Sequence, residues 1–172
     1  LGFITGLSLI FAIGAQNIFV IEQGLKRNFI FTITTICAVS DVLLIFLGIF
    51  IYHALDFISL KVEIFLNFIL VIFLLRFIII KFNETKKIYK IKNIKGLQNI
   101  RNIILKTLGF TYLNPHVYSD TVFFLGNFSK NFLYIDKIYF GLGATLASFL
   151  FFFILGYLSK FLSQYLQNQL TW

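Results

Sequence analysis

The sequence predicts an all-α integral membrane protein. Hydrophobic residues fill 59% of the 172 positions and charged residues 13%, about half the charged fraction of a typical soluble domain. The apolar residues run in stretches of about 20, the helix length that crosses a hydrocarbon core of about 30 Å. The basic residues behind the net charge of +8 cluster in one segment. We therefore expect this charge to set the orientation of the protein in the membrane. We expect no nucleic-acid partner.

Five stretches are expected to be transmembrane helices, at residues 3–21, 29–53, 63–80, 103–125 and 138–158. The first contains Gln16 and Asn17, and the second holds Asp41 near its middle, so neither is a plain lipid-facing helix. The third is mostly Ile, Leu and Phe, with Arg76 near one end, where a long side chain can reach the interface.

The fourth stretch holds a dense group of polar side chains between apolar neighbours. Asn114 precedes Pro115, the one proline of the chain, and Asp120 follows. Proline lacks a backbone N–H and clashes with the preceding turn, so we expect a break that frees carbonyl oxygens near Thr111. Freed carbonyls receive a cation, whereas the N-terminus of a half-helix favours a carboxylate. Polar groups at this depth are costly and usually functional.

The fifth stretch has a face of small residues, formed by Gly141, Gly143, Ala144, Ala147 and Ser148. Such a face permits close helix contact, either inside the bundle or in a homo-oligomer. The polar tail at residues 159–172 is too short to cross. A single cysteine, Cys37, excludes a disulfide framework within the chain.

The longest polar segment indicates the orientation. Between Lys81 and Lys106 the chain has seven lysines and one arginine but a single acidic residue. An RNA-binding tail is one alternative, but a basic loop in a membrane protein usually lies on the cytoplasmic side. We expect residues 82–102 to be that loop. Counting the crossings back from it places Lys26 and Arg27 inside as well, and the N-terminus outside.

The two halves of the chain share a weak internal likeness. At an offset of 100 residues, two small or polar breaks align: Gly14-Ala15-Gln16-Asn17 with Asn114-Pro115-His116-Val117. Three helices per unit would place the second unit upside down, as in many transporters. We therefore expect an inverted 3+3 repeat of six helices, with residues 1–81 as the first unit. Residues 103–172 would form the second unit without its last helix, because the sequence stops at Trp172.

Three ordered motifs point to a known family. They read GAQNIFVIEQG at residues 14–24, SDV at 40–42 and YLNPHVYSDT at 112–121. Together they resemble the first-, second- and fourth-helix signatures of the LysE family of basic amino-acid exporters, and the HVY form resembles its arginine exporter branch. The chain departs from the family pattern at Ala15, where proline is usual, and at Arg76, where an aromatic residue is usual.

The resemblance implies efflux of L-arginine or L-lysine across a bacterial cytoplasmic (inner) membrane by secondary transport, without a cofactor. A cationic substrate needs buried anions, and Asp41 and Asp120 are the candidates. Their attraction for a cation is strong at low dielectric. An isolated buried carboxylate also tends to take up a proton, which suits cation/proton exchange. We expect the pathway to be lined by Gln16, Asn17, Asp41, Asn114, Pro115 and Asp120.

Several alternatives stay open. The two aspartates could be structural, paired with Arg76 or with amide side chains, and the amides could simply join helices. His53 and His116 lack metal-ligand spacing, so we expect structural or interfacial roles for them. No P-loop motif supports ATP-driven pumping. The chain could also be a structural or non-functional fragment of such a transporter, or a membrane-embedded enzyme that uses the aspartates.

Overall fold

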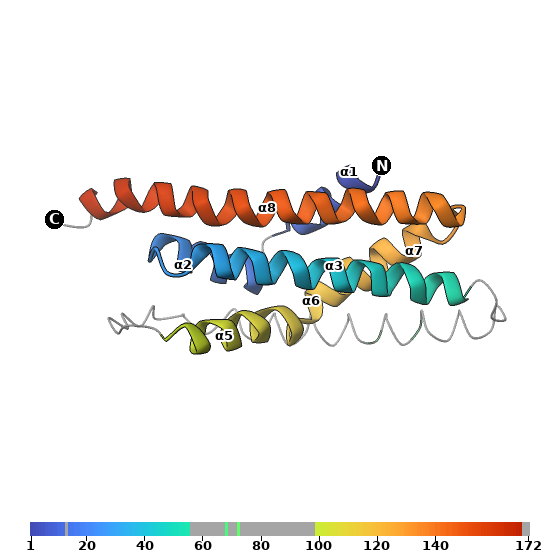
Figure 1. Cartoon of the computed structure of the whole chain (residues 1–172), viewed down its shortest axis with the longest axis horizontal. Helices are drawn as coiled ribbons and strands as arrows, with labels where there is room; N and C mark the ends of the chain where they lie inside the picture. Colours follow the sequence, from blue (N-terminus) through green and yellow to red (C-terminus); the bar gives the residue numbers. More distant parts are fainter. Residues whose placement is uncertain (13, 56–67, 69–71, 73–98, 170–172) are drawn as a thin grey trace.

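The computed structural model is all-helical in the residues that it describes, which are 1–12, 14–55, 68, 72 and 99–169 (Figure 1). In chain order these residues form α1 Gly2–Ile10, α2 Ala15–Leu25, α3 Ile30–Leu55, α5 Ile100–Tyr112, α6 Pro115–Tyr118, the π-helix η1 Ser119–Phe124, α7 Leu125–Ser129 and α8 Tyr134–Gln169. The predicted third span at residues 63–80, except positions 68 and 72, lies outside the described residues, as do Arg76 and positions 82–98 of the basic segment.

Within the part of the chain that the structure describes, two helices, α3 and α8, are long and apolar enough to cross a membrane, and the bent pair of α1 and α2 passes the same test if it is counted as one span. The apolar spans of α3 and α8, Ile30–Ala54 and Tyr134–Ser163, coincide with the second and fifth predicted stretches. α8 continues beyond residue 158, the predicted end of the fifth stretch, to Gln169. No glycine or proline lies between these positions to end the helix.

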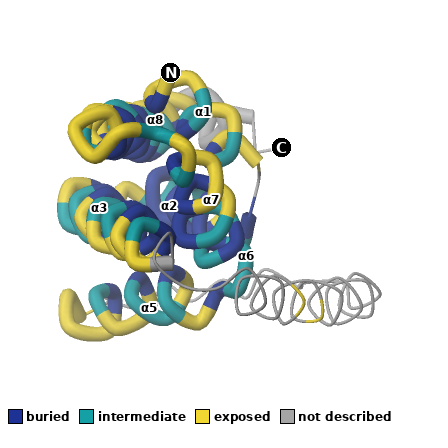
Figure 2. The backbone as a smooth tube through the Cα atoms, turned by 90° about the vertical axis from the view of Figure 1, so that its right-hand side faces the viewer, coloured by how far each residue is buried: buried dark blue, intermediate teal, exposed yellow. Residues whose placement is uncertain are grey.

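The outer sides of the bundle are apolar. Figure 2 shows the buried residues concentrated where α2, α3 and α8 face one another, with exposed residues on the outer sides of α3, α5 and α8. The exposed residues include Leu43 and Leu47 on α3, and Leu146 and Ile154 on α8. A large exposed apolar surface marks a membrane or protein contact, and membrane lipid is the contact that spans of this length and composition fit.

The first predicted stretch, residues 3–21, contains a break. α1 and α2 meet at an angle of 76°, and Gly14 begins α2 in an extended conformation. The Asn17 side chain donates to the carbonyl oxygens of Ile10 and Ala12 at 3.1 and 3.0 Å. It thereby satisfies acceptors that the end of α1 leaves without helical partners. The small and polar residues at this point thus interrupt the helix as the internal likeness indicated.

The fourth predicted stretch is also broken. α5 ends at Tyr112 and α6 begins at Pro115. Asn114 caps α6, because its side-chain oxygen accepts a hydrogen bond from the backbone N–H of His116 at 3.2 Å. Proline therefore starts a helix here and does not kink one, since its missing N–H falls at a position that needs no helical donor. The π-helix that follows, which contains Asp120, was not predicted.

Small residues let the helices touch backbone to backbone. A Cβ atom on Gly6 would lie 2.9 Å from the Cα of Ala144, and one on Gly48 would lie 2.5 Å from the carbonyl oxygen of Val122. α1 therefore lies directly against α8, and α3 against η1. The small-residue face predicted for the fifth stretch is used inside the bundle, where Ala144 and Ser148 are fully buried.

Replacing Gly48 with alanine should destabilise the fold, because the new Cβ would meet a backbone atom of η1 that cannot move alone. Overpacking of this kind costs about 1–3 kcal/mol. Gly109→Ala is the matched control, since its Cβ meets nothing within 4 Å and alanine is favoured over helical glycine by about 0.5–1 kcal/mol.

Thermal unfolding of the purified proteins in detergent tests this expectation. Gly48→Ala should melt at a lower temperature than the parent protein, and Gly109→Ala at the same temperature or a higher one. Equal melting temperatures for all three proteins would contradict the close contact between α3 and η1.

Candidate functional site

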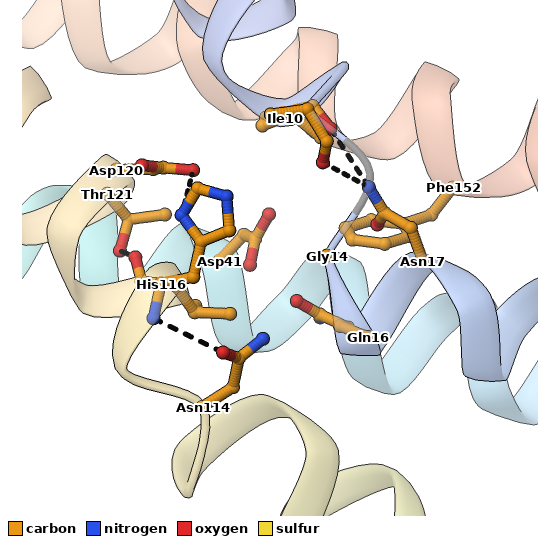
Figure 3. Close-up of a pocket in the computed structure, with 12 residues that line it drawn as sticks. Ile10, Gly14, Gln16, Asn17, Asp41, Asn114, His116, Asp120, Thr121 and Phe152 are labelled. Atoms are coloured by element: carbon orange, nitrogen blue, oxygen red, sulfur yellow. Dashed lines mark hydrogen bonds and ion pairs between the residues drawn. The ribbon is translucent and has the colours of Figure 1, made fainter. Parts of the chain in front are cut away.

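A cavity lies where the two helix breaks face α3 (Figure 3). The polar residues that line it are Gln16, Asn17, Asp41, Asn114, His116, Asp120 and Thr121. Ile10 of α1 and Phe152 of α8 contribute apolar wall. The free space is about 30 Å³, and a buried water needs about 10–15 Å³. The cavity is therefore a polar site inside an apolar bundle, with room for about two water molecules.

Five of the six residues proposed from the sequence line this cavity. Gln16 and Asn17 come from α2, Asp41 from α3, and Asn114 and Asp120 from the segment that follows α5. The sixth, Pro115, is not a lining residue but fixes the start of α6. Folding thus brings together side chains that are nearly 100 positions apart in the sequence. Which of them a substrate touches stays a prediction.

Asp41 is the most deeply buried acidic group of the site, with 2% of its surface exposed. The Ser148 hydroxyl of α8 donates to its Oδ2 at 2.8 Å. Its other oxygen, Oδ1, is buried and has no hydrogen-bond partner among the described residues. A buried acceptor without a donor is costly, so this oxygen indicates a place where a proton, a water molecule or a bound cation belongs.

Asp120 lies on η1 and has closer polar neighbours. Its Oδ2 is 3.2 Å from Nδ1 of His116, and its Oδ1 accepts from the Ser119 hydroxyl at 3.3 Å. A π-helix carries one more residue per hydrogen-bonded turn than an α-helix, and π-bulges are frequent at functional sites. The side chains of Asp41 and Asp120 line the same cavity.

The amide side chains make structural bonds at the helix breaks. Asn17 binds the end of α1, as described above, and Asn114 caps α6. Gln16 donates from Nε2 to the Thr111 hydroxyl of α5 at 3.2 Å. The helix-joining role that the sequence left open for Gln16 and Asn17 is therefore present. A role in a pathway is compatible with it, because both also line the cavity.

Sequence reasoning missed two contributors to the site. His116 was assigned a structural or interfacial role, although its spacing of four residues from Asp120 could have placed both on one helix face. Ser148 was read only as part of a small-residue face. Nothing in the sequence pairs it with Asp41, which lies 107 positions away on another helix. Among the described residues, no three His, Cys, Asp or Glu side chains could share a metal ion.

Comparison with known proteins gives one consistent result. The family model described as LysE type translocator matches residues 7–172. The chain is 37% identical to the arginine exporter protein ArgO of Klebsiella pneumoniae subsp. pneumoniae, over 97% of this chain and 80% of that protein. It is 32% identical to the arginine exporter protein ArgO of Serratia proteamaculans, over 99% of this chain and 84% of that protein. No solved structure matches the chain.

Ser148→Ala should destabilise the protein through Asp41, because it removes the hydroxyl that donates to a buried carboxyl group. Losing the partner of a buried polar group costs about 1–3 kcal/mol. Ser159→Ala is the matched control, since Ser159 is also buried on α8 but its hydroxyl donates to the carbonyl oxygen of Leu155 in its own helix.

Melting temperatures of the two variants, measured alone and combined with Asp41→Ala, separate these effects. The effect of Ser148→Ala should be smaller when residue 41 is Ala, which has no acceptor for the hydroxyl, than when it is Asp, whereas the effect of Ser159→Ala should be independent of residue 41. Additive effects for Ser148→Ala would contradict the pairing with Asp41.

Proposed function

Because the chain belongs to the LysE type translocator family, we propose that it exports a basic L-amino acid, arginine or lysine, by secondary active transport with cation/proton exchange. Membership makes the chain a membrane amino-acid transporter and not an enzyme. The names of the relatives, arginine exporter protein ArgO, support arginine as the substrate. The chemistry of the cavity supports a cation independently.

The observation that carries the proposal is that Asp41 and Asp120 face the same cavity. A cation placed between two carboxylates is attracted to both, and this attraction is much stronger in a bundle of low dielectric than in water. A guanidinium group binds a carboxylate through two parallel hydrogen bonds. The buried Oδ1 of Asp41, which lacks a partner among the described residues, is an acceptor suited to that role.

The α-carboxylate of the substrate needs hydrogen-bond donors, and the start of α2 supplies them. Gly14 lines the cavity and begins this helix, and no side-chain hydrogen bond caps the first turn. The N–H groups of a helix N-terminus, together with the positive end of its dipole, favour an anion. Interrupted helices in transporters bind substrate carboxylates in this way. We therefore propose that the carboxylate binds at α2 and the cationic group between the aspartates.

Transport requires the cavity to open, because about 30 Å³ of free space is far too little for an amino acid. The lining residues divide into two groups. Asp41 lies on α3, which is continuous from Ile30 to Leu55, whereas the other polar lining residues lie on segments next to a helix break. We propose that the interrupted segments move against α3 to give access from either side.

We propose a six-helix architecture of two inverted units in a bacterial cytoplasmic membrane, with the basic residues 82–102 in the cytoplasm. Two contacts fit the order of crossings in this topology. Arg27, which charge counting places inside, donates from Nε to Ser163 near the end of α8 at 3.0 Å. At the opposite end of the bundle, Lys137 and His53 lie 3.4 Å apart. Each contact joins segments that the proposed topology places on one side of the membrane.

Counterflow of labelled arginine in proteoliposomes tests the proposal. Asp41→Asn and Asp120→Asn should each slow exchange by roughly ten- to a hundredfold, because hydrogen bonds to charged groups contribute about 1.5–3 kcal/mol. Asp136→Asn is the matched control, since that carboxylate is exposed at the start of α8. Parent-like exchange in both site variants would contradict the site, and an absence of saturable exchange by the parent protein would contradict export.

Competition experiments in the same proteoliposomes test the preference for a cation. Unlabelled arginine and lysine should compete with labelled arginine, whereas citrulline, which has the shape of arginine but a neutral urea group, should compete at least roughly tenfold more weakly. Equal competition by citrulline would show that the carboxylates do not select the charge of the side chain.

A further inference from the structure

His116 lies between Asp120 and the α1–α2 break. Its Nδ1 is 3.2 Å from Oδ2 of Asp120, and its ring reaches across the cavity towards α2, where a Cβ on Gly14 would lie 3.3 Å from the ring carbon Cδ2. Figure 3 shows the imidazole and both aspartates directed into the same space. Gly14 therefore leaves room for the imidazole ring, because a larger residue at this position would press against it.

A protonated imidazole at this position supplies Asp120 with a positive charge from within the protein. Histidine is the side chain whose charge ordinarily changes between pH 5 and 8. The titratable groups that line the cavity are His116, Asp120 and, from α3, Asp41. The neighbouring α1 and α7 contain no titratable residue. α5 carries Arg101 and Lys106, both exposed, together with Tyr112, and α8 faces the cavity with Phe152.

We propose that His116 is the proton-carrying group of the exchanger and that its protonated ring competes with the cationic end of the substrate for Asp120. The inference rests on the proposed export of a basic amino acid. When the substrate enters, its guanidinium or ammonium group takes the place of the imidazolium beside Asp120. His116 then releases its proton to water, so one positive charge leaves the pair as one arrives.

Exposure distinguishes this pair from Asp41. The side chains of His116 and Asp120 are 33% and 15% exposed, and the cavity that they line has room for water, which is the route that the proposal gives to the proton of the imidazole. Asp41 lines the same cavity but is only 2% exposed, and its Oδ2 accepts a hydrogen bond from Ser148. The site therefore contains one fixed carboxylate and one whose cation can be exchanged.

The pH dependence of arginine counterflow tests this role. With equal pH on both sides of the proteoliposome membrane, the arginine concentration for half-maximal exchange by the parent protein should rise as pH falls, by up to roughly tenfold per unit in the range where imidazole becomes protonated. His116→Gln should remove this rise, since glutamine can still donate to Asp120 but cannot carry the proton. His53→Gln, which changes the second histidine of the chain near the far end of α3, should keep it.

A direct measurement on the parent protein covers the case in which His116→Gln does not fold. Arginine added to the solubilised protein at pH 6 in weak buffer should release about one proton per bound arginine, read with a pH-sensitive dye, and citrulline should release none. Arginine binding without proton release would overturn the inference, as would a parent-like pH profile in a folded His116→Gln protein. An absence of arginine exchange by the parent protein at every pH would instead overturn the export function on which the inference rests.

Discussion

The structure depends on how a membrane-embedded bundle satisfies the backbone groups of two interrupted helices. Lipid provides no hydrogen bonds, so a helix can break at this depth only where protein or a wet cavity supplies partners. Asn17 provides them at the first break and Asn114 at the second. Both breaks face α3, and a buried carboxyl group, Asp41, lies on the helix between them. Each break is therefore satisfied by an amide side chain of its own, and the hydrogen bond from Gln16 to Thr111 joins the two segments.

Close backbone contact is the second requirement, because the breaks must meet without large side chains between them. Gly48 lets η1 approach α3 closely. Because Asp120 lies on η1 and Asp41 on α3, this contact helps to set the position of one carboxyl group relative to the other. Gly14 leaves room for the ring of His116 on the other side. Small residues therefore determine the dimensions of the cavity, although none of them contributes a polar side chain to it.

The sequence predicted well those features that depend on local composition. The spans of α3 and α8 follow from long apolar runs, and the break before α6 follows from Asn114 and Pro115. The π-helix was not predictable, because its apolar residues have no pattern that separates it from an α-helix. The full length of α8 was not predicted, because hydropathy defines the apolar span, whereas the end of a helix depends on caps and helix-breaking residues.

Five proposed site residues line one cavity. This was predictable because polar side chains in a membrane bundle almost always face its interior or a water-filled cavity. Their partners were harder to foresee. The bond from Ser148 to Asp41 depends on how α8 is rotated against α3, and that rotation is decided by packing across the whole interface. The pairing of His116 with Asp120 is local, and their spacing of four residues could have predicted it.

The contact between α1 and α8 differs from ordinary helix packing in a way that bears on motion. Gly2, Gly6 and Gly143 bring main chain against main chain there, so few side chains interlock at these points. Such a surface opposes separation of the helices but offers little resistance to sliding along their axes, the shear type of movement. Because Ile10 at the end of α1 is part of the cavity wall, a small axial shift of α1 would widen or narrow the cavity while the rest of the bundle stays in place.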